Sequence, residues 1–445
     1  MSKVVVLEDV VDRQRFNTVR VAVIVLCFLV MFFDGYELNL IGYVGPALIS
    51  HFSISKAAFG PVISAGLAGF MLGALMLGDL GDRFGRKRVI IAGTILFGAL
   101  TLIAAWSSSL GIFIALRFVA GLGLGGAVPN AVALNAEFAP ARVRATTIGV
   151  MFVGYTLGGA APGWAAAVLL KEFGWRSVFY LGSCLPLLIA ATMIFILPES
   201  VRFLAANKRI KELRILLARM QDEPLPVGDF EILSNEVKAP GSPSLQLFKD
   251  GRGPDTLFLW FAFVSCLTSI LFVMAWSPTL VAGLGIDPGR AALIGAMWQT
   301  GGAIGSLLIT RLLDRFGILT IAFSVLLAIP LVILIGRVGT SETVLMIIIL
   351  IGGLLGSGGQ VGLNAIAGTI YPTMIRSTGV GWAFGMGRVG AILGPLIGGS
   401  LVAAGLDVRN LYVVMSLPFA LTALSVALLF FRGTKRARLV DALTG

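Results

Sequence analysis

The chain has 445 residues, of which 57% are hydrophobic and only 13% are charged, and its mean hydropathy is +0.95. This composition is too apolar for a domain whose surface faces water, so it excludes the class of water-soluble proteins. The formal net charge of +11 would suit an acidic partner, and the placement of the basic residues decides between a nucleic acid and a membrane.

Apolar stretches of about 20 residues recur along the sequence, and each is long enough to cross a hydrocarbon core of about 30 Å as a helix. The first 17 residues are polar, and the apolar stretch after them is too long for a signal-peptide core, so the first span is expected to stay in the mature protein. The sequence predicts an all-α integral membrane protein with twelve transmembrane helices, near residues 18–48, 57–79, 88–106, 109–136, 145–170, 176–198, 257–283, 290–311, 318–337, 343–370, 377–404 and 408–431.

Most lysines and arginines lie at the N-terminus, in the even-numbered connections and in the tail, and few lie in the odd-numbered connections. Cytoplasmic segments of membrane proteins carry this excess, so both termini are expected in the cytoplasm and no nucleic acid is expected as a partner. The predicted segments are a cytoplasmic N-terminus (1–17), a six-helix half (18–198), a cytoplasmic linker (199–256), a second six-helix half (257–431) and a cytoplasmic tail (432–445).

Cysteine and histidine are scarce. Cys27, Cys184 and Cys266 all fall in predicted spans, and His51 is the single histidine. Disulfide frameworks and His/Cys metal sites are therefore not expected. Within the linker, the charged segment 207–219 is expected to form a surface helix.

The two predicted halves share a repeat at an offset of 232 positions. Asp82 and Arg83 correspond to Asp314 and Arg315, and Gly149 corresponds to Gly381. Parallel six-helix halves of this kind are the arrangement of the major facilitator fold, in which the substrate site is expected between the halves.

The connection after the second span runs from Gly78 to Arg88 and has a weaker copy at 313–317. Its glycines allow a tight turn, and its acids and bases can form ion pairs that break and re-form as a gate. A plain basic cytoplasmic loop is the alternative. The gating candidates are Asp82, Arg83, Arg86, Glu137, Arg144, Asp314, Arg315 and Arg376.

The first span contains two acids, Asp34 and Glu37, at positions i and i+3 on one helix face. Acids inside a membrane mark a proton or substrate path in most cases. We select Asp34 as the proton carrier, with Arg117 of the fourth span as its expected partner and Glu37 as a second candidate. A static ion pair at Asp34 and a more aqueous position for Glu37 remain open as alternatives.

These charges break the repeat. At the same offset, Asp34, Glu37 and Arg117 correspond to Cys266, Ser269 and Ile349, so a specific function is favoured over a scaffold role. The glycine run 121–126 lies in apolar helix rather than in a strand-turn-helix unit, so it indicates helix packing and no dinucleotide site.

With these segments the chain resembles the aromatic acid/proton symporter family of the major facilitators, the 4-hydroxybenzoate and benzoate type. The resemblance rests on the first-span segment 34–37, on Arg117-Phe118, on the segments 126–130 and 371–376, and on 385–388, and it covers most of the membrane region. The family pattern has aspartate where this chain has Glu37. The charged positions that the resemblance implies are Asp34, Glu37, Arg117, Glu137, Arg376 and Arg388.

The resemblance implies import of an aromatic carboxylate with protons across the bacterial plasma membrane, by a non-enzymatic, functionally monomeric protein in the lipid bilayer with no cofactor other than the proton. Substrate-binding candidates are Arg388 for the carboxylate, Tyr36 and Trp298 for the ring, and Gln299 and Asn364 for ring hydroxyls, with packing or inter-helix hydrogen bonding as the alternative for the uncharged ones. A porter for another organic acid, a proton-driven exporter and a non-transporting sensor remain as alternative functions.

Overall fold

The computed structural model describes residues 3–6, 17–78, 80–140, 143–220, 230–233, 243–371 and 375–444. In these ranges, eleven helices are long and apolar enough to cross a membrane, and a further apolar helix, Leu319–Ile335, has 17 residues. The prediction of an all-α membrane protein with twelve spans is confirmed, with one span shorter than the rest.

The long helices match the predicted spans one to one. They are α2 (Thr18–His51), α3 (Phe59–Leu77), α5 (Arg86–Ala104), α6 (Leu110–Phe138), α7 (Arg144–Phe173), α8 (Trp175–Ile196), α12 (Gly253–Ala282), α13 (Pro288–Phe316), α14 (Leu319–Ile335), α15 (Glu342–Ile370), α16 (Arg376–Ala403) and α17 (Val408–Thr444). The short elements are β1 (Lys3–Val6), η1 (Lys56–Ala58), α4 (Leu80–Phe84), α9 (Val201–Ala206), α10 (Ile210–Met220), β2 (Phe230–Leu233) and α11 (Pro243–Gln246).

Some boundaries differ from the prediction. Helix α12 begins at Gly253, inside the predicted linker, and α17 continues through the predicted tail to Thr444. The surface helix expected in the linker is confirmed as α10, which buries Leu213 and Leu217 on one side. The parallel pairing of β1 with β2, from Lys3 opposite Phe230 onward, was not predicted.

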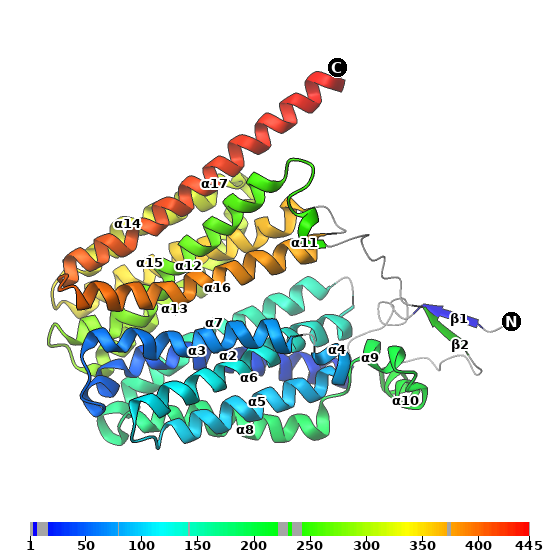
Figure 1. The fold of residues 1–445 in the computed structure, drawn as a ribbon, viewed down its shortest axis with the longest axis horizontal. Coiled ribbons are helices and arrows are strands. Elements are labelled where there is room, and N and C mark those ends of the chain that lie inside the picture. Colours follow the sequence, from blue (N-terminus) through cyan, green and yellow to red (C-terminus); the bar gives the residue numbers. More distant parts are fainter. Residues whose placement is uncertain are drawn as a thin grey trace. The chain divides into compact units, whose positions relative to one another are not determined.

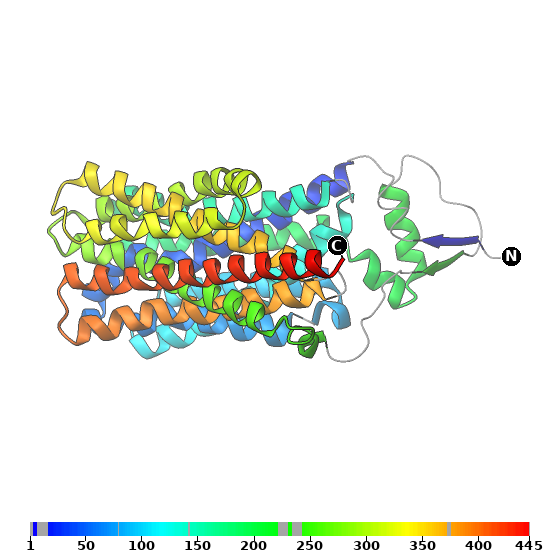
Figure 2. The same cartoon turned by 90° about the horizontal axis from the view of Figure 1, so that it is seen from above.

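The chain forms two compact units. The first unit comprises residues 1–38, 68–159 and 179–237, and the second comprises 39–67, 160–178 and 238–445. Helices α2, α3, α7 and α8 each contribute to both units. Within each unit the long helices run side by side, and in the first unit β1, β2, α9 and α10 lie beyond one end of them (Figures 1 and 2).

Glycines set the helix packing in the first unit. A Cβ on Gly69 or Gly73 of α3 would collide with the backbone of Phe118 or Leu122 on α6. A Cβ on Gly158 of α7 would collide in the same way with α2. Glycine at these positions lets the helix backbones approach closely, which is how helices associate inside a membrane.

The second unit repeats this packing at the offset found in the sequence. Gly301 and Gly305 of α13 face the backbone of Leu350 and Leu354 on α15, each 232 positions after its counterpart in the first unit. Gly390 of α16 likewise faces α12 as Gly158 faces α2. The sequence repeat is therefore a repeat of backbone contacts as well as of motifs.

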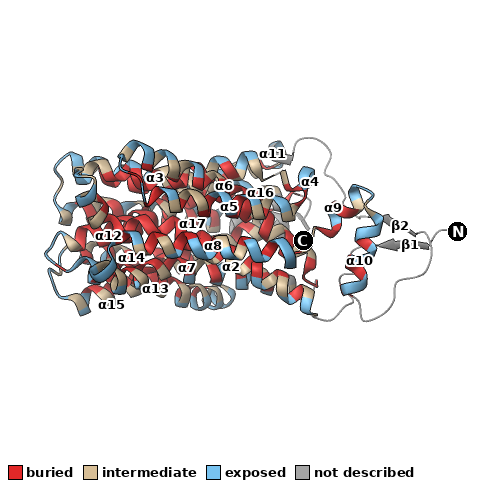
Figure 3. Ribbon diagram, turned by 90° about the horizontal axis from the view of Figure 1, so that it is seen from below, coloured by how far each residue is buried: buried red, intermediate tan, exposed pale blue. Residues whose placement is uncertain are grey.

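The distribution of buried and exposed residues along the long helices is typical of a membrane protein. Buried, intermediate and exposed residues all occur along the long helices (Figure 3), and the exposed ones include large apolar residues. Examples of exposed apolar residues are Leu75, Phe195 and Phe323. Such residues would be unfavourable in water, and they suit contact with lipid chains.

Candidate functional site

The two acids of the first span lie near the middle of α2, away from both of its ends. Asp34 is 1% exposed and Glu37 is 2% exposed. Gly35 between them faces the backbone of Tyr155 on α7, where a Cβ would collide. The close approach of α7 helps to exclude water from this stretch of α2, so the charges of both acids depend on protein groups around them.

Glu37 is held by two other helices of the first unit. Arg117 on α6 forms an ion pair with Glu37 Oε1 through Nη1, and its Nη2 donates to the Glu37 backbone carbonyl at 3.0 Å. Thr101 on α5 donates from Oγ1 to the same Oε1 at 2.6 Å. All three residues are buried, so α2, α5 and α6 meet at one carboxylate.

The expected pairing of Arg117 with Asp34 is wrong, because the carboxylate that Arg117 contacts is Glu37. The sequence placed both acids on one helix face, and that spacing leaves the choice between them open. A difference of one helical turn along α2 decides which acid the guanidinium reaches. Both acids and the arginine are nevertheless buried in the same unit, as the sequence suggested.

Part of this ion pair has no partner. Glu37 Oε2 and Arg117 Nε are buried and make no hydrogen bond with any described residue. Oε1 already accepts from Arg117 and Thr101, so Oε2 is the carboxylate oxygen that is available to take a proton. Most buried polar atoms in proteins are hydrogen-bonded, and a functional role or an ordered water is among the explanations for an exception.

Tyr36, a predicted ring contact for substrate, is buried against α8. A Cβ on Gly182 would lie 2.6 Å from its Cε1, and Phe33 lies nearby with ring centroids 6.0 Å apart. In this structure the Tyr36 ring therefore packs between helices of the first unit.

In the second unit, Trp298 is buried on α13. Its Nε1 donates to Ser357 Oγ at 3.0 Å, and its ring lies over Gly352 and Gly356 of α15. These contacts satisfy the indole and fill the space that the glycines leave. They are the contacts of a packing residue, which was the alternative for this tryptophan.

The polar candidates of the second unit differ in their bonding. Gln299, next to Trp298, is 5% exposed, and its Nε2 has no hydrogen-bond partner among the described residues. Asn364 accepts from Gln360 Nε2 at 3.2 Å within α15. Gln299 therefore has a donor available for a ligand, whereas Asn364 is engaged within its own helix.

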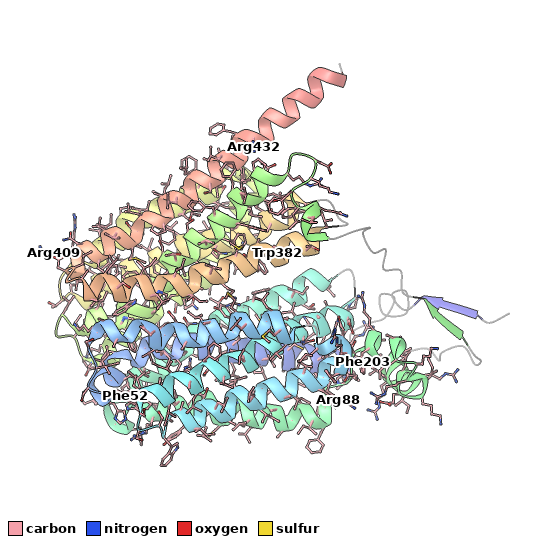
Figure 4. All side chains as sticks on the ribbon, viewed as in Figure 1. Phe52, Arg88, Phe203, Trp382, Arg409 and Arg432 are labelled. Atoms are coloured by element: carbon pink, nitrogen blue, oxygen red, sulfur yellow. The ribbon has the colours of Figure 1, made fainter. Side chains whose placement is uncertain are left out.

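Arg388 lies on α16 and is partly exposed. On the same helix Trp382, 44% exposed, stacks on Trp260 with ring centroids 5.3 Å apart. Figure 4 labels Trp382 and Arg409, which lie toward opposite ends of the second unit.

The loop motif forms an ion-pair network in the first unit. Arg86 pairs with Asp82 at 3.1 Å through Nη2 and with Glu137 through Nη1. The Asp82 side chain is 73% exposed and that of Glu137 is 5% exposed. Ser200 donates to Glu137 Oε2 at 2.6 Å. Glu137 therefore joins α6, the start of α5 and the segment before α9.

Glu199 extends this network. Its Oε1 accepts from the backbone N–H groups of Lys87 at 3.0 Å and Ser200 at 2.8 Å. Gly85, at φ +99°, brings the backbone close to this carboxylate, and a Cβ there would strike it. The carboxylate thus caps the N-terminus of α5, where a negative charge is favourable. Arg88 and Phe203 lie at this same end of the unit (Figure 4).

The other gating candidates are not part of this network. Arg83, Asp314 and Arg315 are exposed, and the described part of the chain gives them no ion pair; Arg315 lies 5.4 Å from the Phe316 ring centroid. The side chains of Arg144 and Arg376 lie outside the described residues, as does the segment 372–374.

Tyr371 lies just after α15, in the segment that resembles the symporter family. It contacts α12. Its hydroxyl donates to Thr256 Oγ1 at 3.3 Å. Burial raises the pKa of the Tyr371 phenol above its ordinary value. The phenol therefore stays protonated at physiological pH and remains a donor.

Comparison with known families decides the class of protein. The profile of the Major Facilitator Superfamily matches residues 27–343 and 257–444. The chain belongs to the Major Facilitator Superfamily. It is therefore a multi-pass membrane transporter and not an enzyme. In the described ranges, no group of three or more His, Cys, Asp or Glu side chains could hold a metal ion.

Several characterised transporters are similar to this major facilitator over almost their whole length. It is 34% identical to the gallate transporter of Pseudomonas putida, over 98% of this chain and 97% of that protein. It is 35% identical to the 4-hydroxybenzoate transporter of Pseudomonas aeruginosa, over 94% of both chains. The benzoate transport protein of Acinetobacter baylyi is 30% identical, over 96% of this chain and 93% of that protein.

Solved structures agree with this fold. A D-xylose–proton symporter superposes with a TM-score of 0.67 at 18% identity, covering 91% of this chain and 97% of that one. The inward-open xylose transporter of Escherichia coli superposes with a TM-score of 0.68 at 16% identity, over 92% and 95% of the chains. At this identity the likeness concerns the fold of the major facilitator alone.

Sequence reasoning missed three residues of these networks: Thr101, Glu199 and Ser200. A threonine in an apolar helix gives no signal in a single sequence, because most such hydroxyls bond to their own helix. Glu199 and Ser200 fall at the start of the predicted linker, and no role followed from that position.

Proposed function

We propose that this major facilitator imports an aromatic carboxylate together with protons, by alternating access across the bacterial plasma membrane. The names of its relatives support the substrate class, since they include transporters of gallate, 4-hydroxybenzoate and benzoate. The resemblance of the first-span segment 34–37 supports the same class.

The observation that carries the proposal is the buried ion pair of Glu37 and Arg117. A proton that reaches Glu37 Oε2 neutralises the carboxylate and removes the ionic part of its attraction to Arg117. The arginine charge is then uncompensated in a low-dielectric environment, which is costly. A substrate carboxylate supplies the missing negative charge, so proton binding and anion binding favour each other.

This mechanism assigns the first proton to Glu37 rather than to Asp34. The contacts of Glu37 supply both an ionic partner and an oxygen that can accept the proton. Asp34, buried on the same helix, is the candidate for a second proton. Arg388 stays the alternative to Arg117 for direct contact with the substrate carboxylate, through its bidentate fork, and Gln299 stays the candidate for a ring hydroxyl.

The network of Arg86 and Glu137 supports a gate at the end of the first unit that carries the loop motif. Its members come from separate helices, so movement of those helices would break the ion pair. The distribution of basic residues supports a cytoplasmic location for this end and for both termini. We further propose a functional monomer in the lipid bilayer that needs no cofactor and uses the proton as coupling ion.

Uptake by proteoliposomes tests the proposal. An inward proton gradient is imposed, and radiolabelled 4-hydroxybenzoate, gallate and benzoate are compared with succinate as a non-aromatic acid. Protein-free liposomes correct for passive entry of the protonated acids, and a protonophore collapses the gradient. We expect protein-dependent, gradient-dependent accumulation of at least one aromatic acid, and its loss in Glu37→Gln.

Two results would overturn the proposal. Accumulation of succinate alone would indicate a porter for other organic acids. Loss of preloaded aromatic acid, driven by protons entering from the opposite side, would indicate an exporter.

A further inference from the structure

Thr101 is the only uncharged side chain that donates a hydrogen bond to the Glu37 carboxylate within the described ranges. Its Oγ1 lies 2.6 Å from Oε1, and the residue is fully buried on α5. It makes this contact across helices, from α5 to α2. No role for Thr101 follows from the sequence motifs or from the ion pair alone.

The usual behaviour of a buried threonine is visible on the same helix. Thr94, seven positions earlier and 2% exposed, donates to the backbone carbonyl of Ile90 at 2.7 Å. Such a bond to the carbonyl four residues back satisfies the hydroxyl without any partner elsewhere. Thr101 instead donates its hydroxyl to a carboxylate on another helix. A bond to its own helix would also have satisfied the hydroxyl, so this contact indicates a role other than the stability of α5.

The geometry of the carboxylate gives this contact a consequence. Thr101 and Arg117 both approach Oε1, and Oε2 remains without a partner. When Glu37 takes a proton, Oε1 becomes a carbonyl oxygen that can still accept from the Thr101 hydroxyl. The threonine can therefore hold the carboxyl group in one orientation in both protonation states.

We propose that Thr101 is a positioning residue for proton coupling: by holding Oε1 it directs the proton to Oε2 and sets the pH at which Glu37 releases Arg117. This inference rests on the proposed role of Glu37 as the proton acceptor. Among the described residues, the titratable or charged side chains that interact with Glu37 are Arg117 on α6 and Tyr36 on α2, and Asp34 lies about one turn away on α2.

The test compares Thr101→Val with Thr101→Ser in the full-length transporter. Valine keeps the shape and removes the donor, and serine keeps the donor. Thr94→Val is the matched control, because it makes the same change at a buried position of the same helix. The readout is initial uptake of radiolabelled 4-hydroxybenzoate, or of the acid that the wild type prefers, across a series of pH values.

Loss of a hydrogen bond to the charged form favours the protonated acid. We therefore expect the pH of half-maximal uptake to rise by about one unit in Thr101→Val, since a hydrogen bond to a charged group changes proton affinity about tenfold. Thr101→Ser and Thr94→Val should keep the wild-type midpoint. If Thr101→Val does not reach the membrane, Thr101→Cys, with a much weaker donor, replaces it and should shift the midpoint in the same direction.

Equal midpoints in Thr101→Val and Thr94→Val would overturn the inference, and so would a shift in Thr101→Ser as large as in Thr101→Val. Glu37→Gln separates this failure from failure of the proposed function. If Glu37→Gln keeps pH-driven accumulation, the role of Glu37 is wrong. If Glu37→Gln loses it while Thr101→Val behaves as wild type, only the role of Thr101 is wrong.

Discussion

Arg117 contacts Glu37 at two separate places: Nη1 lies against the side-chain Oε1, and Nη2 donates to the backbone carbonyl at 3.0 Å. The first contact depends on the charge of the carboxylate, and the second does not. Protonation of Glu37 therefore releases Arg117 from the side-chain ion pair but leaves its hydrogen bond to the α2 backbone, so the charge of the arginine becomes available to an anion.

Replacing Arg117 by Lys tests this double contact. Lysine keeps the charge but lacks the planar fork that reaches both oxygens, so one contact is lost. We expect at least a tenfold fall in proton-driven uptake at unchanged protein abundance. Arg290→Lys is the control, because Arg290 pairs with Glu342 at an exposed site, where an ion pair contributes little. Equal uptake by the two variants would contradict the role of the fork.

The proposed gate at Arg86 predicts a difference between its two acids, Asp82 and Glu137. The Asp82 side chain is mostly exposed, so Asp82→Asn should change the conformational equilibrium by less than about 1 kcal/mol. Glu137 is buried between Arg86 and Ser200, so Glu137→Gln should change it by about 1.5–3 kcal/mol, which is tenfold or more in population.

Thiol labelling from each face of the membrane measures this change, with reporter cysteines placed in a background that lacks Cys27, Cys184 and Cys266. If Asp82→Asn shifts the labelling as much as Glu137→Gln does, the exposed pair contributes more than its geometry allows and the buried pair is not the main contact of the gate.

Much of the fold could be predicted from the sequence because the bilayer imposes it. Hydropathy gave the twelve spans, and the offset between Asp82 and Asp314 recurs in the glycine contacts of Gly69 and Gly301. Helix ends do not follow from hydropathy, since α17 continues past the apolar stretch into a charged segment where hydropathy gives no boundary.

The charged residues of the site could be predicted from the sequence, but the ion pair between Arg117 and Glu37 could not. Acids and arginines inside apolar spans are conspicuous, so Asp34, Glu37 and Arg117 were all identified. Which acid meets Arg117 depends on the packing of α2 against α6, and that geometry does not follow from spacing along one helix. Thr101 could not be found, because its distinguishing feature is the direction of one hydroxyl.

The repeated glycine contacts give a stability prediction with an internal control. Gly69→Ala and Gly301→Ala each place a Cβ against a neighbouring helix backbone, so both should be destabilising by about 1–3 kcal/mol, as expected for overpacking. Gly149 and Gly381 are also related by the repeat, but a Cβ on either meets no atom within 4 Å. Alanine there should be neutral or slightly stabilising, because alanine favours helix.

Thermal unfolding of the purified variants, followed by size-exclusion chromatography after heating, measures these effects. Midpoints that fall equally in Gly69→Ala and Gly149→Ala would show that the helix contact at Gly69 is not the cause.

Arg388 is a candidate for binding the substrate carboxylate, and Arg388→Lys tests it. The lysine keeps the charge and loses the bidentate geometry, so the KM for the aromatic acid should rise about tenfold while kcat changes less. Arg409→Lys, an exposed position at the start of α17, serves as control and should match wild type. An unchanged KM in Arg388→Lys would remove Arg388 from the binding site.

The number of protons determines whether transport moves charge. With Glu37 as the single proton acceptor, one monoanionic substrate and one proton enter together, so the step is electroneutral and the pH gradient alone drives it. A second proton on Asp34 would add one charge, which is worth about 2.3 kcal/mol per 100 mV of membrane potential. Solid-supported membrane recordings distinguish these cases through the current evoked by substrate.

We expect no substrate-evoked current in the wild type, and pH-driven uptake that does not change when potassium and valinomycin set the potential. An inward positive current would contradict the one-proton cycle. Asp34→Asn then locates the second proton: loss of the current with retained pH-driven uptake assigns that proton to Asp34. A well-folded Asp34→Asn protein that loses all pH-driven uptake would give the opposite assignment. Glu37 is intact in that variant, so the loss would show that Glu37 cannot couple transport by itself and that Asp34 is the obligatory proton carrier.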